Sequence, residues 1–261
     1  MAENDIKKFY EYKDLFDNYQ RYFEASYSVS DSFITSYESV RDEFLIYKPY
    51  YEKHTKDYRK NSSYITLGNN SYEFITPNEF SILKSKTIIS DNEKKIINGS
   101  YIGTTFSWEL NSKLRKSKSL NKHEELIKRI LQNVINKNIL EKNYLCKKYT
   151  HFDYIKEIFG IDPLKLNDKE LENELDKHVG EIKEEKGFMS CSMTDSHVLN
   201  GECLLKVYVH EGTKAFVTDN INETEVIFNC GTKYVIIKSE VNSGNKNRII
   251  LHILIIRLKN E

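Results

Sequence analysis

Two carboxylates stand one residue apart in Glu223-Thr224-Glu225, directly before the apolar run Val226-Ile227-Phe228. The apolar run predicts a strand, and side chains two residues apart on a strand point to the same face. We therefore expect both acids to face one site, where a carboxylate can stabilise positive charge that develops in a transition state. Taken alone, the pair also fits two solvated acids on a strand edge.

A run of small polar residues precedes the acids in Gly187-Phe188-Met189-Ser190-Cys191-Ser192. It begins as an apolar strand and ends in hydroxyl and thiol side chains, which also fits a polar strand end that meets a turn. Further upstream, Asn111 and Arg115 are four residues apart and so share one face of a predicted helix. That helix also fits an amphipathic pattern in which Phe106, Leu110 and Leu114 belong to the core.

Together and in this order, the three segments resemble the signatures of the arginine-type mono-ADP-ribosyltransferases, the group that contains the enzymatic components of the clostridial binary toxins. The serine run matches the family's Ser-Thr-Ser motif, and Glu223-Thr224-Glu225 matches its Glu-x-Glu motif. The resemblance extends over residues 90–258. It implies an α+β fold, with a helical N-terminal part followed by a mixed two-sheet ADP-ribosyltransferase sandwich.

The resemblance also implies a reaction, the transfer of ADP-ribose from NAD to an arginine of a target protein, with NAD as a substrate and no metal. Glu225 would stabilise the oxocarbenium-like transition state and hold a ribose hydroxyl. Glu223 would orient the acceptor guanidinium, which is protonated in water, and take its proton during attack. Ser190 would support Glu225 by a hydrogen bond.

A further set of residues is implied to bind the cofactor: Lys147, Ser192, Tyr101, Phe106, Asn111 and Arg115. Asn111 and Arg115 would meet the adenosine or the phosphates, the two aromatic residues would stack, and Ser192 would fix its strand. Lys147, with Lys148 beside it, stands where the family has an Arg. It offers one mobile point charge in place of a bidentate clamp. Cys191 likewise replaces a family Thr.

The spacing of apolar residues and turn signals predicts the elements that position these groups. Helices are expected at 3–25 and 30–58, from Pro77, after Ser90, and at 104–116, 121–137, 151–159 and 167–178, with a hairpin over 64–75. Strands are expected at 143–148, 187–192, 202–210, 214–218, 225–229, 232–241 and 247–258. We divide the chain into a helical N-terminal extension, 1–89, and an ADP-ribosyltransferase-like catalytic core, 90–261, which could also form one continuous domain.

Composition narrows the classes of partner. Lys+Arg and Asp+Glu number 39 each, so no net charge attracts nucleic acid or a membrane surface. The most apolar stretch, 248–258, is too short to span a bilayer, and the N-terminus lacks the pattern of a Sec-type signal. The four cysteines form no CxxC motif, and we expect buried free thiols without zinc.

The resemblance further implies a soluble bacterial toxin or effector that is released or injected and acts in a host cytosol. Its partners would be NAD and a host protein substrate, with actin as one candidate, and a translocation component. Two other interpretations remain open. The chain could be a non-catalytic module of the same fold that binds a protein partner, or an unrelated β-sandwich binding protein without affinity for NAD.

Overall fold

A computed structural model of the chain describes residues 8, 11–13, 15–16, 18–19, 31–54, 70–195, 201–242 and 247–257. Its helices are α2 (Asp31–His54), α4 (Pro77–Ser85), α5 (Asp91–Ser100), α6 (Thr105–Arg115), α7 (Lys122–Lys137), α8 (Phe152–Phe159), the short 3-10 helix η1 (Pro163–Lys165) and α9 (Asp168–Asp176). Its strands are β1 (Tyr144–Thr150), β2 (Ile182–Glu185), β3 (Met189–Ser192), β4 (Cys203–Val209), β5 (Phe216–Val217), β6 (Glu225–Phe228), β7 (Thr232–Val241) and β8 (Ile249–Ile255).

Side-chain caps determine where four of the helices begin. The helices α4, α5, α7 and α9 each start with a capping box, formed by Thr76, Ser90, Asn121 or Asn167 and the Glu three residues later. In each box the two side chains accept hydrogen bonds from each other's backbone N–H groups, which satisfies donors that the first helical turn leaves unpaired. The helices predicted from Pro77 onward are confirmed, and α2 lies within the helix predicted at 30–58.

The sequence does not predict two of the elements. The strand β2 consists mostly of charged residues, and η1 is a single turn after Asp162. The helix predicted at 3–25 and the hairpin predicted over 64–75 lie partly outside the described residues. In the described part, which resumes at Asn70, Glu73 forms one isolated parallel bridge with Tyr144 of β1.

All eight strands belong to one mixed sheet with the order β2-β7-β8-β4-β1-β3-β6-β5. The β4–β8 pair is parallel and the other pairs are antiparallel. The predicted α+β class and the helical N-terminal part are therefore confirmed. The two predicted sheets are two parts of one continuous hydrogen-bonded sheet. They are joined by the β1–β3 pair, in which Lys147 lies opposite Ser192.

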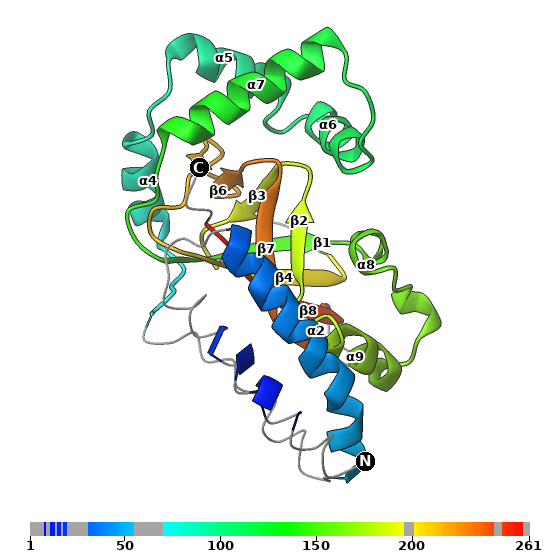
Figure 1. Ribbon diagram of the computed structural model, residues 1–261. Helices are drawn as coiled ribbons and strands as arrows, with labels where there is room; N and C mark the ends of the chain where they lie inside the picture. Colours follow the sequence, from blue (N-terminus) through cyan, green and yellow to red (C-terminus); the bar gives the residue numbers. More distant parts are fainter. Residues whose placement is uncertain are drawn as a thin grey trace.

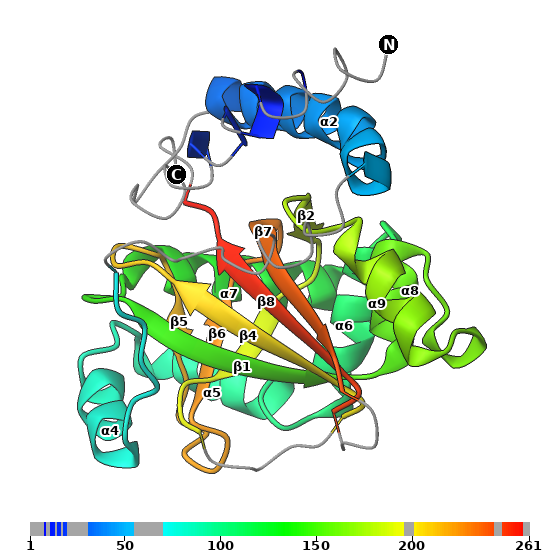
Figure 2. The same cartoon turned by 90° about the horizontal axis from the view of Figure 1, so that it is seen from below.

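Three clusters of buried side chains attach the helices to this sheet. The first packs α4, α8 and α9 against the strands around Leu205 and Leu251. The second packs α2 against β7 and β8 through Tyr37 and Leu254, and Figure 2 shows α2 lying along that part of the sheet. The third packs α5, α6 and α7 against β5 and β6 around Ile227, and these three helices gather at one end of the molecule (Figure 1).

This arrangement brings the chemically interesting segments together. β3 pairs with β6 so that Ser190 lies opposite Ile227 and Ser192 lies opposite Glu225. The helix α6 belongs to the cluster that packs on β6 and on Phe188, the residue before β3. The division of the chain at residue 89 stays a prediction.

Candidate active site

Glu225 is the first residue of β6, and only 7% of it is exposed. Two hydroxyl groups hold its carboxylate, one at each oxygen. Ser190 Oγ donates a hydrogen bond to Oε1 at 2.5 Å, and Thr218 Oγ1 donates one to Oε2 at 3.1 Å. The hydrogen bond expected between Ser190 and Glu225 is therefore present, and Thr218 adds a second one.

The surroundings of Glu225 act on its pKa in opposite directions. Burial raises the pKa, and the negative charge of Glu223 raises it further. Hydrogen bonds from Ser190 and Thr218 and the positive charge of Lys148 act to lower it, and the net pKa lies above the ordinary value. The donors therefore offset part of the burial cost of the ionised form, which is the form able to stabilise positive charge.

Glu223 lies in a turn and not on a strand. Residues 221–224 form this turn, β6 begins only at Glu225, and Thr224 has a left-handed backbone with φ of 46°. The expectation that strand alternation directs both acids to one face is therefore wrong. The charge of Glu223 nonetheless acts on the pKa of Glu225 and raises it.

A cluster of hydroxyl groups supports this unusual turn. A positive φ is rare for a β-branched residue and costs roughly 1–3 kcal/mol, which contacts with the surrounding structure must offset. Thr224 Oγ1 lies 3.0 Å from Ser192 Oγ and 2.7 Å from Thr194 Oγ1, and it donates to the carbonyl of Glu223 at 2.7 Å. Ser192 thus fixes the turn that carries Glu223, while its cofactor-binding role stays a prediction.

Lys147 is enclosed by the protein. It is 3% exposed, and its Nζ donates to Asp195 Oδ1 at 3.1 Å. The rings of Phe74 and Tyr149 lie with their centroids 5.6 and 5.7 Å from the same nitrogen. These contacts occupy the ammonium group of Lys147, which the sequence analysis predicts to bind the cofactor.

Lys148, the next residue along β1, reaches the catalytic candidates instead. Its Nζ donates to the carbonyl oxygen of Ser190 at 3.4 Å, and its charge opposes the effect of burial on the pKa of Glu225. Lys147 pairs with Ser192 across β1 and β3, so strand register puts Lys147, and not Lys148, on the face of Ser190 and Ser192. Lys148 contacts the backbone carbonyl of Ser190, which lies in the plane of the sheet, whereas the Lys147 ammonium group is held by Asp195.

Asn111 ties α6 to the start of the serine strand. Its Nδ2 donates to the Tyr101 hydroxyl at 3.0 Å, and its Oδ1 accepts the backbone N–H of Phe188 at 2.7 Å. Tyr101 is buried, and its ring meets that of Phe188 edge-on. Phe106 packs edge-to-face against His123. In the described structure both rings therefore make core contacts, and their predicted stacking with adenosine remains a proposal.

Arg115 forms a buried ion pair at the end of α6. Its Nε donates to Glu185 Oε1 at 2.8 Å and its Nη2 donates to Oε2 at 3.3 Å, while Glu185 is fully buried. The backbone N–H of Gly187 also donates to Glu185, at 2.9 Å. Burial acts to lower the pKa of Arg115, but the charge of Glu185 outweighs it and the net pKa is raised. The pair joins α6 and β2 to the turn before β3.

The turn before β6 is attached to α4 and α5. Asp219 lies 2.9 Å from Lys94 Nζ and 3.9 Å from Lys84 Nζ, and it accepts a hydrogen bond from Asn98 at 3.4 Å. Burial acts to raise the pKa of Asp219, but these partners outweigh it and the net pKa is lowered. The helices therefore hold the base of the turn, while Ile221 within it is exposed.

Sequence reasoning missed Thr218, Asp219 and Glu185. None belongs to a recognisable motif, and the partners of Asp219 and Glu185 lie far along the chain. The one local signal available is a polar residue at the end of a predicted strand, because Thr218 is the last residue of the strand predicted at 214–218 and Asp219 follows it. Glu185 had no such signal, because the strand that it ends was itself not predicted.

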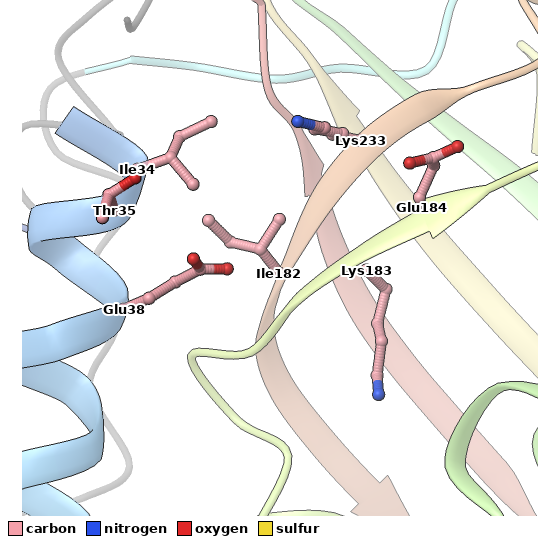
Figure 3. A pocket seen from close by; sticks show the side chains of 7 residues that line it. All are labelled: Ile34, Thr35, Glu38, Ile182, Lys183, Glu184 and Lys233. Atoms are coloured by element: carbon pink, nitrogen blue, oxygen red, sulfur yellow. The ribbon is translucent and has the colours of Figure 1, made fainter. Parts of the chain in front are cut away.

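A separate hollow of about 380 Å³ lies between α2 and β2, where Ile34 and Ile182 point toward one another (Figure 3). None of its lining residues contacts the Glu225 carboxylate, so it is not part of the candidate active site.

Across the described ranges, no group of three or more His, Cys, Asp and Glu side chains could bind a metal ion. No helix in the same ranges is long and apolar enough to cross a membrane. The four cysteines are free thiols, and three of them are buried.

Comparison with known proteins gives a family and a fold. A sequence model described as ADP-ribosyltransferase exoenzyme matches residues 50–257, whereas no curated protein sequence matches significantly. The C3 exoenzyme of Clostridium limosum superposes with a TM-score of 0.62 at 18% identity, over 72% of this chain and 98% of that chain. C3stau2 of Staphylococcus aureus, solved with NAD, gives 0.61 at 21% identity, over 72% and 99% of the two chains.

A binary-toxin component shares the fold as well. BECa of Clostridium perfringens, solved with NADH, superposes with a TM-score of 0.55 at 16% identity. The match covers 72% of this chain but 49% of that chain, so the present chain corresponds to about half of it. At these identities the likeness shows a common fold.

Proposed function

Since the chain belongs to the ADP-ribosyltransferase exoenzyme family, we propose that it transfers ADP-ribose from NAD to an arginine of a target protein. The buried Glu225 carboxylate carries this proposal, because Ser190 and Thr218 hold it in place and the charge of Glu223 acts on it. The presence of NAD in the C3stau2 structure, which has the same fold, supports NAD as the donor.

Glu225 is assigned the electrostatic part of the reaction. When the bond between nicotinamide and ribose breaks, the electron pair leaves with nicotinamide and positive charge develops on the ribose. A carboxylate that is largely removed from water stabilises this charge strongly, because little solvent screens the interaction. An ionised carboxylate has about four acceptor positions, so Glu225 can accept a ribose hydroxyl in addition to its two hydroxyl donors.

Glu223 is assigned the role of binding and orienting the acceptor guanidinium. Its position in a turn and its partial exposure suit a side chain that meets a group arriving from solvent. A guanidinium can donate two parallel hydrogen bonds to a carboxylate, which would orient one nitrogen toward the ribose carbon. As the new nitrogen–carbon bond forms, that nitrogen loses a proton, and Glu223 is placed to accept it.

Binding of the NAD phosphates, which the sequence assigns to Lys147, is better assigned to Lys148. The Lys147 ammonium is engaged by Asp195, whereas Lys148 lies beside Ser190. A lysine attracts a phosphate as a point charge, without the bidentate geometry of arginine. The contacts proposed for Asn111 and Arg115 would extend the cofactor site along α6.

The biological setting follows from the family as a proposal. We infer a bacterial toxin or effector that acts on a host protein, with actin as one candidate and a translocation component as a further partner. The alternative is a non-catalytic member of the same fold that binds a protein partner. The two differ in whether the chain cleaves NAD.

The test combines NAD titration by calorimetry, nicotinamide release and transfer to agmatine as a small guanidine acceptor. The wild-type chain should bind NAD, release nicotinamide and modify agmatine. Glu225→Gln should release nicotinamide at least about a hundredfold more slowly, the range for losing one electrostatic stabiliser. Glu125→Gln, at an exposed position on α7, is the matched control. Absence of NAD binding would favour the non-catalytic alternative, and release without transfer would refute the arginine acceptor.

A further inference from the structure

We propose that Thr218 is a positioning residue of the active site, which fixes the orientation and favours the ionised form of the Glu225 carboxylate. Its effect on the carboxylate follows from the geometry alone, while its effect on turnover rests on the proposed function. Thr218 itself is fully buried and is assigned no contact with substrate.

The direction of the Thr218 hydroxyl is determined by its two partners. The backbone N–H of Asn220 donates to Thr218 Oγ1 at 3.1 Å, and this group can act only as a donor. The hydroxyl proton is therefore available to Glu225 Oε2, 3.1 Å away, where an ionised carboxylate can only accept. A backbone hydrogen bond from Thr218 N to the carbonyl of Glu225, at 3.0 Å, holds the two residues in register.

The two hydroxyl donors reach Glu225 from opposite sides of its strand. In the sheet, β6 lies between β3, which carries Ser190, and β5, which Thr218 follows. The last torsion of a Glu side chain is broad, so one hydrogen bond leaves the carboxylate plane free to rotate. Two donors on different oxygens fix that plane. Thr218 thus supplies the restraint that Ser190 cannot supply alone.

The charged and titratable groups that face Glu225 come from several elements. Glu223 precedes it in the turn, Lys148 extends from β1, and Tyr101 lies between α5 and α6. Against this background, a hydroxyl that donates to the carboxylate favours the ionised form. Removing the donor should move the titration of Glu225 to higher pH, and the acidic limb of nicotinamide release should move with it.

Three variants separate this role from simple packing. Thr218→Val keeps the shape and removes the hydroxyl, whereas Thr218→Ser keeps the hydroxyl and removes the methyl group. Thr213→Val is the control, because Thr213 is also buried but its hydroxyl donates to the carbonyl of His210. Should Thr218→Val fail to fold, Thr218→Ala removes the same donor with less crowding.

The first measurement is a carbon-13 NMR titration of the glutamate carboxyl groups, with Glu225→Gln identifying the resonance. Thr218→Val should raise the pKa of Glu225 by roughly one to two pH units, the size of one hydrogen bond to a charged group. Thr218→Ser and Thr213→Val should leave it unchanged. An unchanged pKa in Thr218→Val, or a Thr218→Ser variant that behaves like Thr218→Val, would overturn the inference.

The second measurement is the pH dependence of nicotinamide release. Thr218→Val should lower kcat about tenfold, with a smaller change in KM for NAD, and Thr218→Ser should restore it. An equal loss in Thr213→Val would show that general packing is responsible and would overturn the inference. If the wild-type chain releases no nicotinamide, the proposed function fails, while the NMR titration still decides the role of Thr218.

Discussion

Replacing Lys148 with Met removes one positive charge beside Ser190 and Glu225 and keeps most of the length of the side chain. The hydrogen bond from Lys148 Nζ to the Ser190 carbonyl is long, at 3.4 Å, so little native structure depends on it. A charge-assisted contact with a phosphate contributes roughly 1–3 kcal/mol. We therefore expect Lys148→Met to weaken NAD binding by about ten- to a hundredfold.

The same substitution at the preceding residue is the matched control. Met at position 147 keeps the apolar stem between Phe74 and Tyr149. It removes an ion pair whose other partner, Asp195, is 76% exposed, and such pairs contribute about 1 kcal/mol or less. Lys147→Met should therefore bind NAD like the wild type and lose little stability.

Calorimetric titration with NAD at two salt concentrations, with urea unfolding of each variant, checks this pair of expectations. A larger loss of affinity in Lys147→Met than in Lys148→Met would return the phosphate-binding role to Lys147. Equal losses that vanish at high salt would indicate a general electrostatic effect and no specific contact. Either result would refute the assignment of NAD phosphate binding to Lys148.

Two further outcomes are expected. Glu223→Gln should keep most of the nicotinamide release with water as acceptor but lose most of the transfer to agmatine, because water needs less orientation than a guanidinium; an equal loss of both rates would contradict the division of roles between Glu223 and Glu225. Glu185→Gln should lower the free energy of unfolding by about 3–5 kcal/mol, because it leaves the Arg115 guanidinium buried without its charged partner. Urea unfolding checks the second outcome, and a double variant with Arg115→Gln should recover part of the loss.

Local signals explain why most elements could be predicted from the sequence. A capping box needs only residues that are three apart, so the starts of α4, α5, α7 and α9 are encoded within a few positions. The motif residues Ser190 and Glu225 were identified by the resemblance of their segments to the family's motifs, and the structure joins them by a hydrogen bond.

Backbone detail at Glu223 could not be predicted in the same way. The pattern of Glu223-Thr224-Glu225 before an apolar run is that of a strand, and strand alternation is a property of an uninterrupted extended backbone. The left-handed conformation of Thr224 interrupts it, and hydroxyl groups from Ser192 and Thr194 stabilise that conformation. Because these contacts come from another strand and its following turn, the short pattern around Thr224 carries no trace of them.

The sequence by itself determined the α+β class, the order of the elements and the residue types of the candidate site. The tertiary structure alone decided the partners of Lys147 and Lys148, because Asp195 and the Ser190 carbonyl, which their ammonium groups contact, lie far from β1 in the sequence. It alone placed Thr218 on the second carboxylate oxygen, because β5 and β3 must first pair on opposite sides of β6. Local sequence patterns determine which helices and strands form, whereas strand register and pairing across the sheet determine which side chains come into contact.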